Sequence, residues 1–174
     1  FTELTNLENL YSQAFQNTNL QEIALSNTKL SEINDAFRNV KKRNSIKFPQ
    51  TITKLGDVFR GCTLTEIDLS NYTNLKTLES TFSDSRDLVK VTLPEGLLSI
   101  NNAFQGCEKL ATINLLKSLQ TIGNSAFSGT KLQIVDLSGL TELQGIGSYA
   151  FSSCNELSEI LFPTSLEQIG EYAF

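Results

Sequence analysis

The sequence predicts a right-handed solenoid built from coils of about 23 residues, with short parallel strands on one face and turns and short helical turns on the other. Two observations lead to this prediction. Phenylalanines recur every 22 to 24 residues: Phe15, Phe37, Phe59, Phe82, Phe104, Phe127, Phe151 and Phe174. A short sequence motif recurs and ends on the phenylalanine, as in "IGNSAF", "IGSYAF" and "IGEYAF". A unit this short cannot bury its own apolar edge, so neighbouring units must stack.

The first element of each unit is a very short strand of the pattern I-x-L, as at Ile67 and Leu69. A period of two places both of these side chains on the inner face. The residue that follows is Pro or Ser in several units: Pro49, Pro94, Pro163, Ser26, Ser70 and Ser138. Pro has no amide donor, so it ends the strand and turns the chain.

The second half of each unit carries apolar residues at L-x-x-I spacing, as at Leu97 and Ile100, which favours an irregular second side. The G-x-x-A-F segment that follows favours a turn or a single helical turn. It places the phenylalanine beneath the next coil. We therefore expect one domain over residues 1–174, with seven to eight coils. The sequence lacks an initial Met and stops within the repeat phrase, so we expect an excerpt of a longer chain.

The repeat resembles the BspA-like class of leucine-rich repeats. The resemblance rests on segments such as "LVKVTLPEGLLSINNAFQGCEKL" and "LSEILFPTSLEQIGEYAF", and it covers nearly the whole chain. Such repeats occur in surface and secreted proteins of bacteria and some protists. The resemblance implies an extracellular or cell-surface location and adhesion to macromolecules. It supplies no catalytic residues.

The composition argues against several classes of function. The chain has no histidine, which removes the commonest general base and metal ligand. It has no nucleophile or phosphate-binding motif, so we expect no enzyme activity, no catalytic residues, no metal site and no cofactor. A net charge of −5 argues against nucleic acid as a partner. No apolar run is long enough to insert into a membrane.

The three cysteines occupy one column of the repeat. Cys62, Cys107 and Cys154 each stand three residues after a repeat phenylalanine. Other units place small residues in this column: Thr18, Val40, Ser85 and Thr130. The column therefore predicts buried structural thiols, too far apart along the solenoid for a disulfide.

Charge is distributed unevenly along the chain. Residues 38–60 carry seven bases against the single acid Asp57: Arg38, Lys41, Lys42, Arg43, Lys47, Lys54 and Arg60. No base follows Lys131. The N-terminal band is then either a solvated surface or a docking site for an acidic ligand. Arg43 stands in a position that is Leu in other units. We expect it at the surface, through snorkelling or a shift of register.

The outward positions of the I-x-L strands are mostly small or polar. Ile134 and Leu161, with Leu116 close by, are the exceptions. Such a group is either a contact site or a surface covered by residues outside this segment. The candidate ligand-binding residues are thus Lys41, Lys42, Arg43, Lys47, Ile134 and Leu161. We expect a non-enzymatic binding or adhesion module for a protein or glycan ligand. The alternatives are an accessory substrate-presenting domain or a spacer in a larger surface enzyme or receptor.

Overall fold

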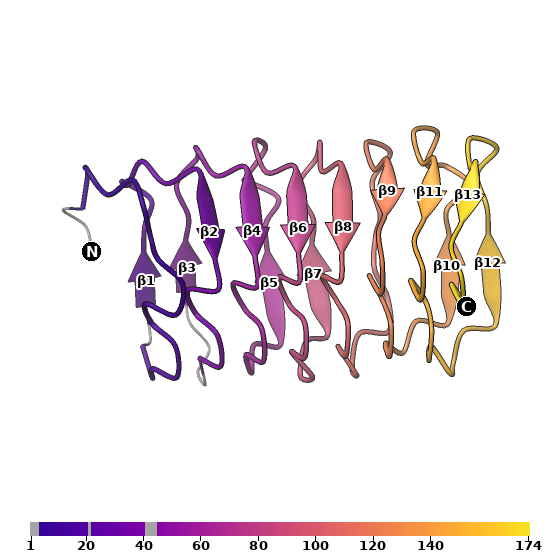
Figure 1. Cartoon of the computed structure of the whole chain (residues 1–174), viewed down its shortest axis with the longest axis horizontal. Coiled ribbons are helices and arrows are strands. Elements are labelled where there is room, and N and C mark those ends of the chain that lie inside the picture. The colour runs from indigo at the N-terminus through magenta and orange to yellow at the C-terminus, as the bar shows by residue number, and fades with distance from the viewer. Residues whose placement is uncertain (1–3, 21, 41–44) are drawn as a thin grey trace.

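The computed structural model describes residues 4–20, 22–40 and 45–174. They form a solenoid whose coils follow one another along the long axis, from the N-terminus to the C-terminus (Figure 1). Each strand has two or three residues, and the described residues contain no helix. The solenoid of short parallel strands is therefore confirmed.

The I-x-L segments form the strands of one face, here called the first face. These strands are β1 (Glu22–Ala24), β3 (Ser45–Lys47), β5 (Glu66–Asp68), β7 (Lys90–Thr92), β10 (Ile134–Asp136) and β12 (Glu159–Leu161). They pair in parallel as β1 with β3, β5 with β7, and β10 with β12. The middle residues Val91 and Val135 are buried and their neighbours are exposed, as the period of two predicts.

The second face is a sheet, which corrects the expectation of turns and short helical turns there. Seven parallel strands run along it without a break: β2 (Glu32–Asn34), β4 (Lys54–Gly56), β6 (Thr77–Glu79), β8 (Ser99–Asn101), β9 (Thr121–Ile122), β11 (Gly145–Ile146) and β13 (Gln168–Ile169). Each strand has only one inward residue, such as Leu78 or Ile100. A single buried residue produces no alternation in the sequence, so the pattern resembled irregular structure.

The phenylalanine turns extend the contacts between coils. From Phe59 to Phe174 each ring stacks on the next, with centroids 5.3 to 5.6 Å apart. The amide of Phe82 donates to the carbonyl of Ala103 at 2.8 Å, and the same bond recurs along the column. Offset or parallel rings at this distance add to the burial energy. Each phenylalanine therefore links its coil to the next through both ring and backbone.

Two left-handed residues flank each of these phenylalanines. The position two residues before it has positive φ in every unit: Gln13, Asp35, Asp57, Ser80, Asn102, Ser125, Tyr149 and Tyr172. The position two residues after it does so at Asn17, Asn39, Gly61, Asp84, Gly106, Gly129 and Ser153. Gly, Asn and Asp tolerate this conformation best, which explains most of the residues found there. The residue types on both sides of the phenylalanine therefore favour this turn.

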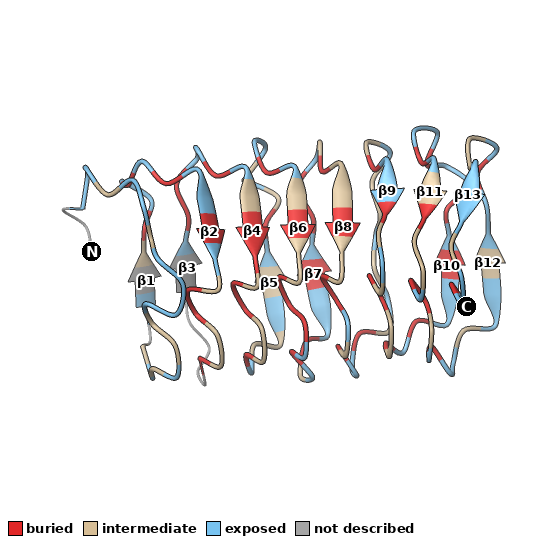
Figure 2. Ribbon diagram, viewed as in Figure 1, coloured by how far each residue is buried: buried red, intermediate tan, exposed pale blue. Residues whose placement is uncertain are grey.

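The core is one continuous apolar column between the two faces (Figure 2). Phe82, Phe104 and Phe127 are fully buried in its middle. At the C-terminal coil, Phe174 is 52% exposed and Ile169 is 51% exposed. Burial therefore weakens towards that coil.

The first face is interrupted where the second face is continuous. No sheet joins β3 to β5, and residues 111–115 form no strand between β7 and β10. Each strand that is followed by Pro (β3, β7 and β12) pairs with the strand before it. Segments followed by Ser70, Leu116 or Ser138 do not. Pro holds the preceding residue extended, and the Ser-followed strands β5 and β10 pair only with the strand after them.

In two of the coils that do not pair backwards, an aspartate at the end of the strand holds the turn that follows. The Asp68 carboxylate accepts the Ser70 amide at 2.9 Å, and Asp136 accepts the Ser138 amide at 2.9 Å. Hydrogen bonds from the serine hydroxyl and amide lower the pKa of Asp68 and that of Asp136. A recurring D-L-S turn thus marks the coils that follow an interruption.

Candidate functional site

The exposed apolar pair lies on two strands that pair directly. Ile134 begins β10 and Leu161 ends β12, and the register places Ile134 opposite Glu159 and Asp136 opposite Leu161. The exposed fractions are 60% for Ile134 and 42% for Leu161. Phe162, which follows Leu161, is also 42% exposed. The first face therefore presents an apolar surface on a hydrogen-bonded strand pair, with carboxylates beside it.

A groove opens on the same face at the interruption between β7 and residues 112–116. Its volume is about 510 Å³. Apolar side chains from both sides line it: Val91 and Leu93 from the coil of β7, and Ile113 and Leu116 from the next coil. Ile113 is half-buried, whereas Val91 and Val135 in the same column are buried. Ile67 and Ile160 of the same column are half-buried as well, on strands that do pair.

The basic band is only partly described. Lys41, Lys42 and Arg43 lie outside the described residues, so the position of Arg43 stays a prediction. Lys47 is exposed on β3. Lys47 is the one of these four residues that the structure describes, so the docking band stays a prediction.

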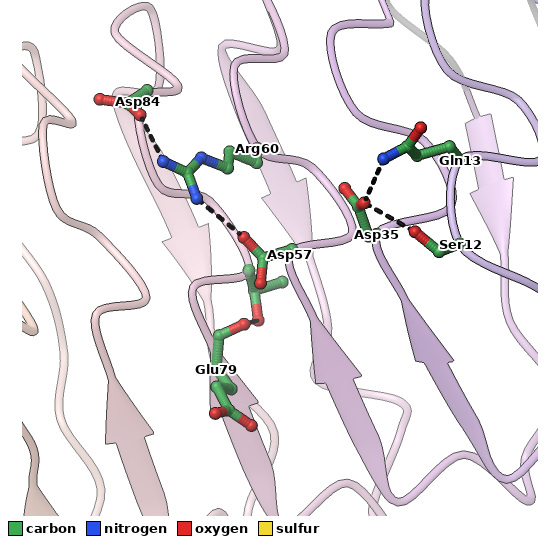
Figure 3. A network of polar contacts seen from close by, with 8 residues as sticks. Ser12, Gln13, Asp35, Asp57, Arg60, Glu79 and Asp84 are labelled. Atoms are coloured by element: carbon green, nitrogen blue, oxygen red, sulfur yellow. Dashed lines mark hydrogen bonds and ion pairs between the residues drawn. The ribbon is translucent and has the colours of Figure 1, made fainter.

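Two other bases of the band are paired with acids of the following coils. Lys54 contacts Glu79 at 2.6 Å, and this hydrogen bond raises the pKa of Lys54. Arg60 contacts Asp57 at 3.3 Å and Asp84 at 3.6 Å (Figure 3). These pairs are partly exposed, so each contributes little to stability. They reduce the positive charge that the linear sequence suggested, because Glu79 and Asp84 lie one coil further along the chain.

The cysteine column is part of the core. Cys62, Cys107 and Cys154 are free and buried, as the spacing predicted. Their thiols donate to the carbonyl oxygens of phenylalanines of the preceding coil, at 3.1 to 3.2 Å. Burial raises the pKa of Cys62 to about 11 and that of Cys107 to about 12. These thiols are therefore structural, and they are poor nucleophiles at neutral pH.

Ser85 shows what the column requires. Its hydroxyl donates to the Phe59 carbonyl at 2.6 Å, in the same way as the thiols. Small side chains fill this column, and all of them except Val40 can donate a hydrogen bond. In the described part of the chain, no group of three or more histidine, cysteine or acidic residues is placed to hold a metal ion. Among the same residues, no helix is long and apolar enough to cross a membrane.

The repeat itself decides the family. The model of the family described as "BspA type Leucine rich repeat region (6 copies)" matches residues 2–85 and 76–174. The chain belongs to this family. The resemblance seen in the sequence is thereby confirmed. Among curated proteins, no sequence matches significantly.

Three solved structures are similar to this chain, and the one with a TM-score above 0.5 shares its fold. A leucine-rich cell surface protein from Faecalibacterium prausnitzii A2-165 has a TM-score of 0.53 and 23% identity, over 87% of this chain and 48% of that one. A leucine-rich repeat protein from Bacteroides ovatus ATCC 8483 has a TM-score of 0.48 and 20% identity, over 95% and 67%. The pneumococcal vaccine antigen PcpA has a TM-score of 0.48 and 18% identity, over 94% and 64%. The chain spans about half the length of the first of these.

The groove is the feature that reasoning from the repeat did not single out. The outward residues that line the groove, such as Thr92 and Asn114, attracted attention only as polar side chains on the outer side of the I-x-L segments. One signal was available: the coil that contains Leu116 lacks the Pro found after β3, β7 and β12. In this BspA-type chain, the residue after the I-x-L segment thus separates coils that pair backwards from coils that do not.

Proposed function

We propose that this chain is a non-enzymatic binding or adhesion module that presents its first face to a protein or glycan ligand. The observation behind the proposal is the apolar pair, Ile134 and Leu161, exposed on paired strands β10 and β12. Exposed apolar groups rimmed by polar residues are typical of contact sites. A pre-formed strand pair also loses little conformational entropy when it binds a ligand.

The proposal includes a location at the cell surface or outside the cell. Its support is membership of a leucine-rich repeat family together with the descriptions of similar folds as a leucine-rich cell surface protein and a vaccine antigen. The absence of histidine from the sequence and the burial of the three thiols agree with a role that is not catalytic. The ligand is then recognised by the shape and polarity of the surface.

An array of glycans and extracellular-matrix proteins tests the proposal. The wild-type protein should bind at least one member of the array. The double variant Ile134→Ser with Leu161→Ser should lose that binding by about tenfold or more, because buried apolar anchors carry most of the energy of an interface. Its free energy of unfolding should change by less than about 0.5 kcal/mol per substitution, since both side chains are exposed.

Tyr11→Ser is the matched control. Tyr11 is 81% exposed and stands near the opposite end of the solenoid. This variant should bind as the wild type does. Failure of the wild type to bind any member of the array, or equal binding by the double variant, would contradict the proposal.

A further inference from the structure

Two of the three interruptions of the first face can be compared residue by residue: the one between β3 and β5, and the one between β7 and residues 111–115. In each following coil, a turn ends on a core leucine whose amide bonds back three residues. Leu75 donates to the carbonyl of Tyr72 at 2.9 Å, and Leu119 donates to that of Leu116 at 3.0 Å. Counted back from the second face, Tyr72 and Leu116 therefore hold equivalent positions, although Tyr72 stands three residues after Leu69 and Leu116 only one residue after Leu115. They face the equivalent residues Phe48 and Leu93 of the preceding coils.

The first interruption is filled by Tyr72. Its ring packs edge-on against Phe48, with centroids 5.5 Å apart. Its hydroxyl accepts the Phe48 amide at 3.1 Å. In a paired coil the corresponding amide bonds to the backbone of the next coil, as Leu69 does to Thr92 at 2.9 Å. A phenol thus replaces the missing strand: the ring covers the apolar surface and the oxygen satisfies the backbone donor.

At the interruption between β7 and residues 111–115, the equivalent backbone donor is the Leu93 amide, and no tyrosine side chain fills the gap. Leu93 is buried, yet within the described residues its amide has no hydrogen-bond partner. No backbone hydrogen bond of the described chain joins β7 to residues 111–115. Leu116 stands where Tyr72 stands in the first interruption, but its side chain has no oxygen. Leu93 lines the groove, so a ligand that supplies an acceptor can pair with this amide.

The groove has the size and chemistry for such a ligand. Its volume of about 510 Å³ lies within the range of small-ligand sites. Val91, Leu93, Ile113 and Leu116 supply the apolar lining. Asn114 and Glu95 also line the groove and offer oxygen acceptors for a hydroxyl proton. A ring with one hydroxyl group can therefore be covered on its faces and hydrogen-bonded through its oxygen.

We propose that this groove binds a tyrosine side chain from an exposed segment of a partner protein, as Tyr72 fills the equivalent interruption within the chain. The proposal rests on the proposed function, because it names one partner chemistry for the same face. The Leu93 amide recognises the tyrosine hydroxyl, and the apolar side chains around that amide contact the ring. Phenylalanine lacks the oxygen that this amide needs, so the groove should favour tyrosine.

The test is a nuclear magnetic resonance titration of the ¹⁵N-labelled protein with p-cresol, which has the ring and hydroxyl of tyrosine. The Leu93 amide should shift and saturate, together with amides of residues 113–116. Toluene, which lacks the hydroxyl, should bind about two- to tenfold more weakly, the value of one hydrogen bond. The absence of saturable shifts at these amides, or equal binding of toluene, would overturn the proposal.

Leu116→Tyr supplies the ring from the chain itself. In this variant p-cresol should no longer shift the Leu93 amide, and that amide should exchange more slowly with solvent. Undiminished p-cresol binding by the folded variant would overturn the proposal, and the wild-type titration decides the matter independently if the variant does not fold. A methyl glycoside that shifts the same amides at lower concentration than p-cresol would also overturn it, in favour of a glycan. Array binding that depends on Ile134 and Leu161, without p-cresol shifts, would refute this inference alone and leave the proposed function standing.

Discussion

The two faces of the solenoid are built from equally short strands, yet only the second face is a continuous sheet. On the second face all seven strands pair, and the phenylalanine turns beside them continue the backbone bonds. On the first face three strand pairs are separated by interruptions. The difference shows that the apolar repeat fixes which residues are inside, whereas pairing across the first face varies from coil to coil. Each coil that pairs backwards has Pro after its strand. A variable face on a rigid scaffold is suited to recognition.

The difference also separates stability from function. The phenylalanine column and the second face hold the coils together through identical contacts in unit after unit. The first face carries the exposed apolar pair and the groove. Substitutions on the two faces should therefore have different consequences, and four predictions test this from the largest expected effect to the smallest.

The first prediction concerns the phenylalanine column. Phe104 is fully buried between the rings of Phe82 and Phe127, each 5.4 Å away. Phe104→Ala should lower the free energy of unfolding by about 3–5 kcal/mol, through lost burial and a cavity. Phe174→Ala should cost much less, because Phe174 is half exposed. Urea denaturation measures both values, and equal losses would contradict the stacking order.

The second prediction compares glycines on the two faces. A Cβ at Gly147, directly after β11, would lie 2.5 Å from the Asn124 nitrogen and 2.6 Å from the Gly123 carbonyl carbon. Gly147→Ala should cost roughly 1–3 kcal/mol, because backbone atoms of the neighbouring coil must shift. Gly139, in a turn after β10, has no atom within 4 Å of such a Cβ.

Gly139→Ala is the matched control for this pair, and it should change stability by less than about 0.5 kcal/mol. Both values can be read from urea unfolding curves. A loss at Gly139 as large as that at Gly147 would show that the coils are equally close on the two faces.

The third prediction concerns alkaline pH. Burial raises the pKa of Cys107 to about 12 from 9.0, so the folded state holds this proton more tightly than the unfolded state. The resulting stability is complete below about pH 9 and is lost as the pH rises towards 12, by about 1.4 kcal/mol per pH unit.

Cys107→Ser removes this dependence while keeping the hydrogen-bond donor, since Ser85 fills the same column. Unfolding free energies of the wild type and the variant at pH 7, 9 and 10 should converge as the pH rises. Parallel curves would mean that the thiol does not differ between the folded and unfolded states.

The fourth prediction concerns the filled interruption. Tyr72→Phe keeps the ring against Phe48 and removes the oxygen that accepts its amide. The loss should be about 1 kcal/mol, the cost of one unsatisfied donor. Tyr149→Phe is the control, because Tyr149 is 46% exposed and its change should be near zero. A Tyr72→Phe protein as stable as the wild type would indicate that the hydroxyl is dispensable there.

Much of the fold could be predicted from the sequence, because stacked units repeat their contacts. The phenylalanine column, the I-x-L strands and the buried thiols all follow from residues that recur at one position of each unit. The second sheet could not be predicted, since strands such as Thr77–Glu79 have one inward residue and no alternation. Pairs such as Lys54 with Glu79 were also missed, because they join residues one coil apart.

The candidate site could be predicted only in part. Exposure of Ile134 and Leu161 followed from the strand period. The groove did not, because it depends on a backbone bond that is absent. The sequence feature that could have indicated the groove is the residue after each I-x-L segment. We had interpreted that residue only as marking where the strand ends.

Native-state hydrogen exchange tests the central contrast between the faces most directly. On the second face, the amides of Gly123 and Gly147 bond to the preceding coils at 2.6 and 2.7 Å. On the first face, the amides of Leu93 and Leu115 have no partner among the described residues. We predict that Leu93 and Leu115 exchange at least roughly 100-fold faster than Gly123 and Gly147. Equal protection at all four amides would show that the first face is as continuous as the second and would contradict the account.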